Sequence, residues 1–393
     1  MSIMYVPYHM HSMLSNGTTN IDSITNFRDY VKVAADCGIP ALGISEHGNI
    51  FEWLHKKEAI EKAGMKYIHC VEAYITADTD DTPEKKRDNY HCVLIAKNYD
   101  GVKEINRMTS KSFNRDDCHF YYMPRITFDE LYATSDNVII TTACLGGVLH
   151  NGDDIVKEQF LTFLANNKHR CYLEIQHHNI EEQIEYNKYL YAISKATGVP
   201  LIVGTDTHAL NELQMEGRSI LQAAKDVHFD GEDSWDLVFK TPEELLNAYK
   251  KQKSLPINVV EGAMQNSIRM AESIEPFDVD HSPKYPKLYD DSEAVFKEKI
   301  NQGVVSRGIM SKPNYQEYVD RIHYEYDTYK HNGAIDFMLL EEDYKSEMRR
   351  QGIRYGYSRG SVSGSVIAYL LGITEVDSVK YNLNFERKQY CAL

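Results

Sequence analysis

Strand-like and helix-like segments alternate through the first two hundred residues, and this alternation limits the folds that the chain can adopt. Seven short runs are rich in Val, Ile, Leu and Tyr, as buried strands are. These runs are Met4–Tyr8, Ala41–Ser45, Lys66–Ile75, His91–Ala96, Val138–Thr142, Cys171–Gln176 and Leu201–Thr205. Strands that alternate with helices lie parallel in one sheet. Seven such units predict a closed or nearly closed α/β barrel. An open Rossmann-type sheet is the alternative, but no GxGxxG motif follows the first strand.

Capping residues and apolar periodicity predict the helices. Asn20 is expected to cap a helix whose apolar face includes Phe27 and Val31. Residues 180–196 carry another apolar face, and 211–275 look helical, with Thr241 as a cap and a proline in the first turn. An irregular Pro- and Asp-bearing stretch follows at 276–291. We therefore predict two domains, 1–275 and 276–393, with helices over 292–306 and 314–331 in the second.

Composition sets the protein class and compartment. The chain of 393 residues is long enough for two or three domains. It has neither the roughly 18–20-residue apolar run of a membrane span nor a signal peptide, which predicts no membrane partner and a cytoplasmic location. Seven cysteines without a CxxC motif predict reduced thiols. The net charge of −15 disfavours nucleic-acid binding, but residues 344–362 hold five basic side chains against one acidic one.

Metal-ligating residue types gather where the predicted strands end, which is where α/β barrels carry their chemistry. These residues are His9, His11, Glu46, His47, Glu72, Cys144, Gln176, His177, His178, Asp206 and His208. The alternating pairs His9/His11 and Asp206/His208 each project two ligands to one side of the chain. Imidazole, carboxylate and thiolate donors suit Zn²⁺, Mn²⁺ or Fe²⁺, and several sets on one face predict two or three ions that hydrolyse a phosphoester. The spacing leaves His177 and His178 ambiguous, and isolated histidines such as His69 are interpreted as packing residues.

Several of these segments resemble the polymerase-and-histidinol-phosphatase (PHP) domain found at the N-terminus of C-family DNA polymerase III α subunits. The similar segments are Tyr8-His9-Met10-His11-Ser12, Gly43-Ile44-Ser45-Glu46-His47-Gly48-Asn49, Val71-Glu72-Ala73-Tyr74, His91-Cys92-Val93-Leu94, Thr142-Ala143-Cys144-Leu145-Gly146-Gly147 and Gly204-Thr205-Asp206-Thr207-His208. The resemblance implies a distorted (β/α)7 barrel. It also implies eight metal ligands: His9, His11, His47, Glu72, His91, Cys144, Asp206 and His208. Catalysis is expected of His9, His11, Glu72, Asp206 and His208.

One position departs from the family pattern. An aspartate ligand usually follows the H-x-H-S motif, whereas here the segment reads Ser15-Asn16-Gly17-Thr18. We expect the Asn16 amide to stand in for that carboxylate as a weaker ligand. This departure leaves open the alternative that the barrel is a non-catalytic scaffold.

The second half resembles the start of the family's polymerase palm, an α+β domain. Residues 333–349 are similar to the helix that enters the palm, and 358–365 to its G-R-G-S-x-x-G-S motif. The resemblance implies that the triphosphate of an incoming nucleotide binds to Ser358, Arg359, Gly360, Ser361, Gly364 and Ser365. The palm's catalytic aspartates are not found, so the palm is expected to be incomplete. Mg²⁺ would serve polymerisation only if another chain supplied those aspartates.

The resemblance implies the N-terminal part of a replicative DNA polymerase III α subunit, bacterial or phage-encoded, whose barrel is a metal-dependent 3′→5′ exonuclease or phosphoesterase. The expected ligands and partners are DNA, dNTP, a complementary C-terminal polymerase chain, and the sliding clamp with other replisome subunits. The alternatives are the scaffold of a split polymerase and a stand-alone phosphatase.

Overall fold

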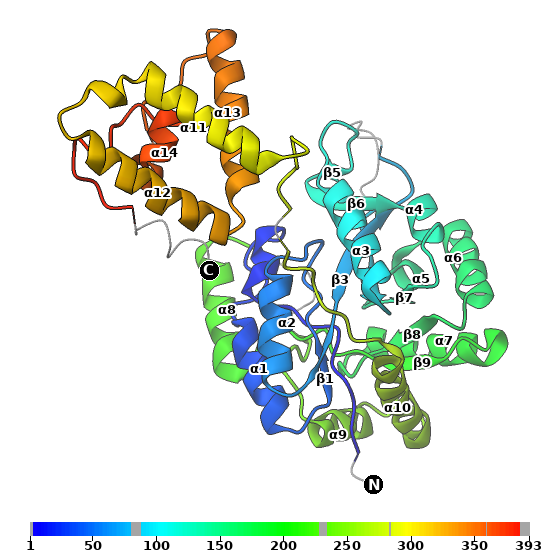
Figure 1. Ribbon diagram of the computed structural model, residues 1–393. Coiled ribbons are helices and arrows are strands. Elements are labelled where there is room, and N and C mark those ends of the chain that lie inside the picture. Colours follow the sequence, from blue (N-terminus) through cyan, green and yellow to red (C-terminus); the bar gives the residue numbers. More distant parts are fainter. Residues whose placement is uncertain (1–2, 80–87, 228–233, 283, 359, 386–393) are drawn as a thin grey trace. The chain divides into compact units, whose positions relative to one another are not determined.

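The computed structural model describes residues 3–79, 88–227, 234–282, 284–358 and 360–385 (Figure 1). The chain divides into two compact units, 1–279 and 280–393, which are described separately here. Among the described residues, no helix combines the length and apolar composition needed to cross a membrane.

The described part of the first unit contains nine strands. They are β1 (Ala41–Gly43), β2 (Lys66–Ile68), β3 (Cys70–Thr76), β4 (Tyr90–Ala96), β5 (Phe120–Tyr121), β6 (Met123–Thr127), β7 (Val138–Thr141), β8 (Cys171–Ile175) and β9 (Leu201–Val203). The order in the larger sheet is β5-β6-β3-β4-β7-β8-β9, and β1 pairs with β2 in parallel. Six of the seven predicted strand segments therefore coincide with observed strands.

The N-terminal segment closes this sheet into a ring. Met10 forms a parallel bridge with Thr207, and the Pro7 carbonyl accepts a hydrogen bond from the Gly43 N–H at 3.0 Å. A further bridge joins His47, beyond β1, to Glu72 in β3. The predicted barrel of seven segments is confirmed, although the first segment makes isolated bridges rather than a regular strand.

The expectation that all strands run parallel is wrong for β4. It pairs antiparallel with β3 on one side and with β7 on the other. Parallel neighbours require a crossover connection, usually a helix, whereas antiparallel neighbours can be linked directly. β3 and β4 pair antiparallel over six residues.

Eleven helical segments accompany the strands of the first unit in the part that the structure describes. They are η1 (Met13–Gly17), α1 (Phe27–Asp36), α2 (Trp53–Lys62), α3 (Tyr99–Ser112), α4 (Phe128–Tyr132), α5 (Val148–Asn151), α6 (Asp154–Asn166), α7 (Glu181–Thr197), α8 (Glu212–Ala224), α9 (Pro242–Gln252) and α10 (Ile257–Ser273). Thr241 caps α9 in a capping box, as predicted. The cap of α1 is Asn26 rather than Asn20, because the residues before Asn26 form a loop whose Asp22 and Ser23 are buried.

Apolar side chains fill both faces of the barrel wall. Val6, Val93, Ile95, Ile139 and Ile202 belong to one buried cluster, and a larger cluster joins the strands to α3, α6, α7, α9 and α10. Alternate residues of a strand face opposite sides of a sheet, so each inner strand supplies both clusters. Burying one such side chain stabilises the fold by about 1.5–3 kcal/mol. The packed wall therefore holds the strand ends in fixed positions.

The regular elements of the second unit are all helical in its described residues. Its elements are α11 (Ser292–Ser306), η3 (Ile309–Ser311), α12 (Tyr315–His331), α13 (Ile335–Arg350), η4 (Gly360–Gly364) and α14 (Val366–Leu370). Phe296, Ile300, Met338, Leu339 and Ile367 lie in its buried core. The helices predicted at 292–306 and 314–331 are confirmed to within one residue.

Candidate metal centre

The Glu72 carboxylate on β3 lies at the middle of the histidine cluster. Its Oε1 is 3.2 Å from His9 Nε2 and 3.0 Å from His91 Nδ1. Its Oε2 is 2.8 Å from His47 Nδ1 and 3.3 Å from His11 Nε2. Four imidazoles from three segments of the chain thus surround one fully buried carboxylate. Two oxygens that face different histidines allow Glu72 to bridge neighbouring cations.

Three overlapping groups have ligand atoms within 4.8 Å of one another. The groups are His11, Asp22, His47 and His208; His9, His11, Glu72 and Asp206; and His47, Glu72 and His91. His11, His47 and Glu72 each belong to two groups, so the groups are contiguous. Imidazole and carboxylate donors gathered in this way suit divalent metal ions.

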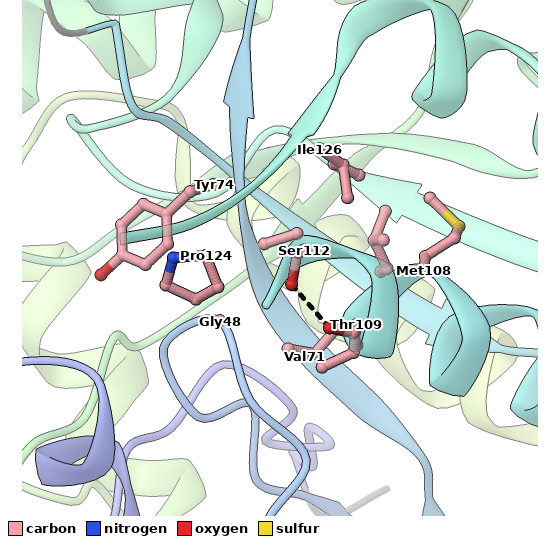
Figure 2. A pocket seen from close by; sticks show the side chains of 10 residues that line it. Gly48, Val71, Tyr74, Met108, Thr109, Ser112, Pro124 and Ile126 are labelled. Carbon is pink, nitrogen blue, oxygen red and sulfur yellow. Dashed lines mark hydrogen bonds between the residues drawn. The ribbon is translucent and has the colours of Figure 1, made fainter. Parts of the chain in front are cut away.

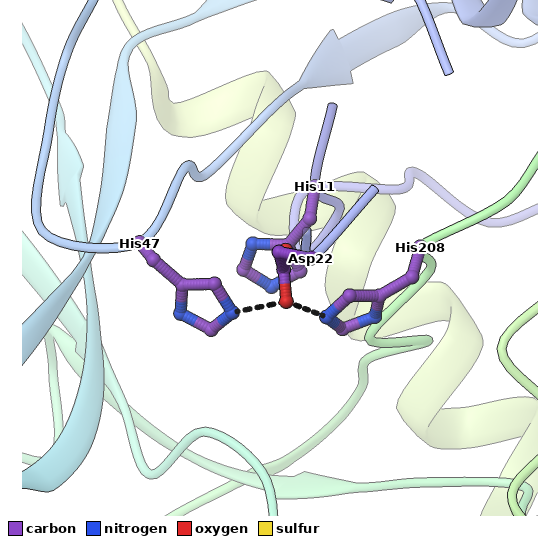
Figure 3. Close-up of side chains that lie close together, drawn as sticks. All are labelled: His11, Asp22, His47 and His208. Atoms are coloured by element: carbon purple, nitrogen blue, oxygen red, sulfur yellow. Dashed lines mark ion pairs between the residues drawn. The ribbon is translucent and has the colours of Figure 1, made fainter. Parts of the chain in front are cut away.

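Asp22 is the ligand that the sequence prediction missed. Its Oδ1 lies 3.2 Å from His208 Nε2 and 3.4 Å from His47 Nε2, so the carboxylate sits between the two rings (Figure 3). Asp22 is the only acidic residue between His11 and Asp29. That fact was a usable signal, but Asp22 lies farther from the H-x-H-S motif than the family pattern led us to expect.

The structure corrects the expectation for Asn16, whose side-chain amide bonds to the backbone of its own loop. Its Oδ1 accepts hydrogen bonds from the backbone N–H groups of Asp22 (2.7 Å) and Ser23 (3.1 Å), and its Nδ2 donates to the Ser23 carbonyl. The amide therefore shapes the loop that brings Asp22 to the cluster. A carboxylate at position 16 would lack the N–H that donates to Ser23.

Close atoms in the cluster point toward shared positions rather than at one another. His9 Nε2, His47 Nδ1, Glu72 Oε2 and Asp22 Oδ2 are buried and have no hydrogen-bond partner among the described residues. Metal–ligand distances of about 2.0–2.2 Å place neighbouring ligand atoms about 3.0–3.5 Å apart. The observed separations near 3 Å therefore fit ligand atoms arranged around bound cations.

Glu174 on β8 orients His9 from behind. Its Oε1 lies 2.6 Å from His9 Nδ1, which leaves Nε2 free to face the cluster. Tyr8 and Thr141 donate their hydroxyl hydrogens to Glu174 Oε2 at 2.9 and 2.8 Å. Gly204 makes room for this carboxylate, because a Cβ there would lie 1.9 Å from Glu174 Oε1. A carboxylate behind a metal-ligating histidine fixes its tautomer and raises its basicity.

Glu46 forms a second buried support below the cluster. It accepts hydrogen bonds from Lys56 Nζ (2.6 Å), Ser12 Oγ (2.5 Å) and Ser15 Oγ (2.7 Å). Burial alone would raise the pKa of Glu46, but Lys56 and the two serines hold it below its usual value. Ser15 Oγ also lies 3.3 Å from His11 Nδ1. Glu46, a residue at a strand end, is therefore placed behind the ligands and not among them.

Gly48 and Tyr74 fix the loop that carries His47. Gly48 has a φ of +59°, and a Cβ there would lie 2.5 Å from Pro124 Cγ. Figure 2 shows Gly48 with Tyr74 and Pro124 around a small pocket that Val71, Met108, Thr109 and Ser112 also line. The Tyr74 ring stacks on His47, with centroids 5.9 Å apart. Any side chain at position 48 would therefore displace His47.

Cys144 lies at the edge of the cluster. Its Sγ is 3.4 Å from His91 Nδ1 and 3.8 Å from Glu72 Oε1, and it accepts a hydrogen bond from the Gly146 N–H. Burial, together with Asp206 and Glu72, raises the pKa of the Cys144 thiol well above its usual value. A bound cation would reverse that effect, because coordination deprotonates a thiol.

Opposite charges dominate the electrostatics of the centre. Burial would raise the pKa values of Asp22, Glu72 and Asp206, but the surrounding histidines hold all three well below their usual range. Burial would lower the pKa of His47, but Asp22 and Glu72 raise it well above normal. His11 differs: burial and the neighbouring His47 and His208 lower its pKa to about 4.

In the second unit, the Gly/Ser segment predicted to bind nucleotide divides into two parts. Ser365 caps α14 and donates its hydroxyl hydrogen to buried Glu325, and the Gly364 carbonyl accepts from Arg321. Ser358 Oγ lies 2.5 Å from Ser363 Oγ, while Gly360 and Ser361 are exposed. The prediction for Arg359 lies outside the described residues. Ser365 and Gly364 thus serve packing, and the exposed part stays available to a ligand.

The fold and the ligand set together define a PHP domain. The PHP domain family matches residues 7–190, and the bacterial DNA polymerase III alpha NTPase domain matches residues 294–388. The recognition drawn from the motifs is confirmed: along 98% of its length the chain is related to DNA polymerase III alpha subunits. Identity is 30% with the subunit of Borreliella burgdorferi and 29% with that of Aquifex aeolicus.

The chain spans about a third of the length of these curated relatives, 34% and 35% respectively. Among solved structures, a two-domain protein of Bacteroides vulgatus described as containing a PHP-like metal-dependent phosphoesterase is similar with a TM-score of 0.36 and 12% identity. That likeness covers 72% of this chain and 73% of the other.

Proposed function

We propose that the chain is the N-terminal part of a replicative DNA polymerase III alpha subunit, and that its barrel hydrolyses phosphodiesters at DNA 3′ ends. One observation carries the hydrolytic part: three groups of mostly buried candidate ligands are joined through the shared residues His11, His47 and Glu72. Structural sites usually hold one closed, four-coordinate ion, whereas multinuclear sites with shared carboxylates are typical of phosphoester hydrolysis.

The cofactors would be two or three Zn²⁺, Mn²⁺ or Fe²⁺ ions held by His9, His11, Asp22, His47, Glu72, His91, Asp206 and His208, with Cys144 beside them. When bound, such ions activate water and neutralise the charge of the phosphate. Exposure indicates the open side. The His91 side chain is 22% exposed, whereas those of Glu72 and His9 are fully buried. The substrate would therefore approach past His91.

The residues around the ligands keep them in place for this reaction. Glu174 directs His9, the Asp206 carbonyl lies 2.8 Å from His208 Nδ1, and Ser15 contacts His11. Each of these histidines has one ring nitrogen held by the protein and the other directed at the centre. Such preorganisation means that little rearrangement is needed when substrate binds.

The second unit would contribute to nucleotide binding through Ser358, Arg359, Gly360 and Ser361 of its Gly/Ser segment. DNA, dNTP, a complementary polymerase chain and the sliding clamp remain the proposed partners, with Mg²⁺ joining only at a completed polymerase site.

A nuclease assay on the full chain tests the hydrolytic proposal. The chain, loaded with Mn²⁺ or Zn²⁺, should shorten a 5′-labelled single-stranded oligonucleotide from its 3′ end. His9→Ala and Asp206→Ala should abolish this activity, whereas His55→Ala, at an exposed position, should not. A chain that binds no transition metal, or cleavage that survives both substitutions, contradicts the proposal.

The alternatives make different predictions. A scaffold would bind metal and gain stability without any turnover. The sequence support for a scaffold was Asn16, and the Asp22 carboxylate beside His208 and His47 argues against that alternative. A stand-alone phosphatase would cleave phosphomonoesters but not DNA 3′ ends. That alternative leaves the second unit, which the related polymerase subunits share, without a role.

A further inference from the structure

His177 and His178 are buried imidazoles that the metal centre does not use. They directly follow β8 and are 1% and 0% exposed. All four of their ring nitrogens lack a hydrogen-bond partner within the described part of the chain, although Asp236 Oδ2 lies 3.7 Å from His177 Nε2, beyond hydrogen-bond distance. Another buried histidine, His69, shows the usual arrangement: its ring nitrogens lie 2.9 Å from Tyr67 Oη and 2.8 Å from Asn106 Oδ1. Burial of unpartnered polar groups is unfavourable, and native proteins keep such groups where a ligand satisfies them.

Two chains of contacts link the pair to the metal centre. Gln176, next to His177, donates from Nε2 to Glu174 Oε1, the oxygen that also holds His9.

On the other side, the backbone N–H of His208 donates to the Leu237 carbonyl at 2.8 Å. Two residues before Leu237, the Trp235 ring stacks on His178 with centroids 5.5 Å apart and an interplanar angle of 25°. The pair is therefore part of the wall beside Asp206 and His208.

The surroundings indicate the kind of ligand. Burial lowers the pKa of both imidazoles to about 3, so each ring is neutral and offers one N–H donor. Neither ring belongs to one of the groups of three or more candidate metal ligands in the described residues. Neutral donors suit the oxygens of a phosphate group, because they add hydrogen bonds without repelling cations that neutralise its charge.

We propose that His177 and His178 bind the phosphate oxygens of the nucleotide held at the metal centre, on the side of the phosphate that faces away from the ions. This inference rests on the proposed phosphoesterase function and extends it by naming residues that bind substrate without touching metal. Trp235 positions His178 through the ring stack.

The test compares His177→Phe/His178→Phe with His69→Phe as a matched control. Inorganic phosphate affinity is measured on the Mn²⁺-loaded full chain by ³¹P NMR line broadening, beside metal content and the melting temperature of the metal-free chain. The double variant should keep its metal, bind phosphate at least about tenfold more weakly, and melt at a higher temperature, because no buried donor is left unpaired. His69→Phe should melt lower and bind phosphate normally.

Single His177→Gln and His178→Gln variants retain a donor near Nε2 and should recover part of the phosphate affinity. Unchanged phosphate affinity in the double variant, in a chain that takes up metal, overturns this inference and leaves the proposed function standing. Loss of metal from the double variant also overturns it, because the rings would then support the ligands. A wild-type chain that takes up no metal contradicts both proposals.

Discussion

Asn16 Oδ1 accepts a hydrogen bond from the backbone N–H of Asp22 at 2.7 Å, and this contact turns the loop toward the metal centre. The same oxygen accepts from Ser23, whose hydroxyl donates to the His208 carbonyl at 2.6 Å. The loop is thus tied at one end to η1 and at the other to the segment that carries a ligand. An amide at position 16 determines where a carboxylate six residues later is placed.

Replacing Asn16 by alanine should weaken metal binding by about tenfold, because Asp22 loses its support while every ligand stays present. Isothermal titration with Mn²⁺ measures the change. Asn20→Ala, at an exposed position in the same loop, serves as the control and should bind metal like the wild type. Equal affinities in the two variants would show that the Asn16 contacts do not position Asp22.

Asp22→Asn should have a larger effect than Asn16→Ala. It removes the charge that pairs with His47 and His208 while conserving shape. We expect metal content to fall and phosphoesterase activity to drop on the order of 100-fold or more. Asp29→Asn on the exposed face of α1 should change neither. Full metal content and activity in Asp22→Asn would remove Asp22 from the ligand set.

Glu174→Gln tests the support behind His9. The glutamine amide cannot hold the Nδ1 proton of His9 as a carboxylate does. Its NH₂ group would also face hydroxyls that donate to Glu174 Oε2 in the wild type. Metal affinity should fall about 10–100-fold. Glu185→Gln, on an exposed part of α7, is the control. If Glu174→Gln keeps wild-type affinity, the 2.6 Å contact has no influence on the centre.

The sequence sufficed for the barrel and for most ligands because both follow from local patterns. Strand runs carry their own apolar signature, and the pairs His9/His11 and Asp206/His208 need only an extended backbone to face one way. The direction of β4 was not accessible in this way, since pairing direction depends on how β3 and β4 are connected.

Loop geometry explains why the sequence prediction missed Asp22 and why it proposed Asn16 as a ligand. Asp22 reaches the centre only because contacts of Asn16 and Ser23 fold the intervening residues back. Neither contact produces a repeating pattern in the sequence that could have predicted it. The spacing of residues in the sequence also could not distinguish the role of His177 and His178 from that of the metal ligands. An unpartnered ring nitrogen is recognised only when every neighbour is known.

Stabilisation by metal should increase as the pH rises from about 6 to 8. In the metal-free barrel, burial opposes protonation of His47 and His208, but nearby carboxylates raise their pKa values above the ordinary value of about 6.5. Those histidines therefore stabilise the metal-free chain below about pH 6.5, and this contribution is lost as the pH rises through the raised values. Metal ions bind neutral imidazoles, so the affinity for metal increases as the pH rises.

Melting curves with Mn²⁺ and with EDTA, recorded across this pH range, measure that difference. A hundredfold excess of metal over its Kd corresponds to about 2.7 kcal/mol of stabilisation, so the effect is measurable. Asp22→Asn should flatten the pH dependence. A metal-induced shift that is constant or shrinks with rising pH would contradict the assignment of these histidines as ligands.

Substitutions of Ser365 and Ser361 should separate the packing role from the proposed nucleotide-binding role within the Gly/Ser segment of the second unit. Ser365 is buried, caps α14 and bonds to Glu325 and Tyr329, so Ser365→Ala should destabilise this unit by about 1–2 kcal/mol. Ser361 is exposed, and Ser361→Ala should leave stability unchanged while weakening dNTP binding if this segment holds the triphosphate. Denaturant titration and fluorescent-dNTP binding measure the two effects. The whole segment would be assigned to packing if two results were found together. Ser365→Ala would lose dNTP binding only in proportion to its unfolded fraction, and Ser361→Ala would bind dNTP like the wild type.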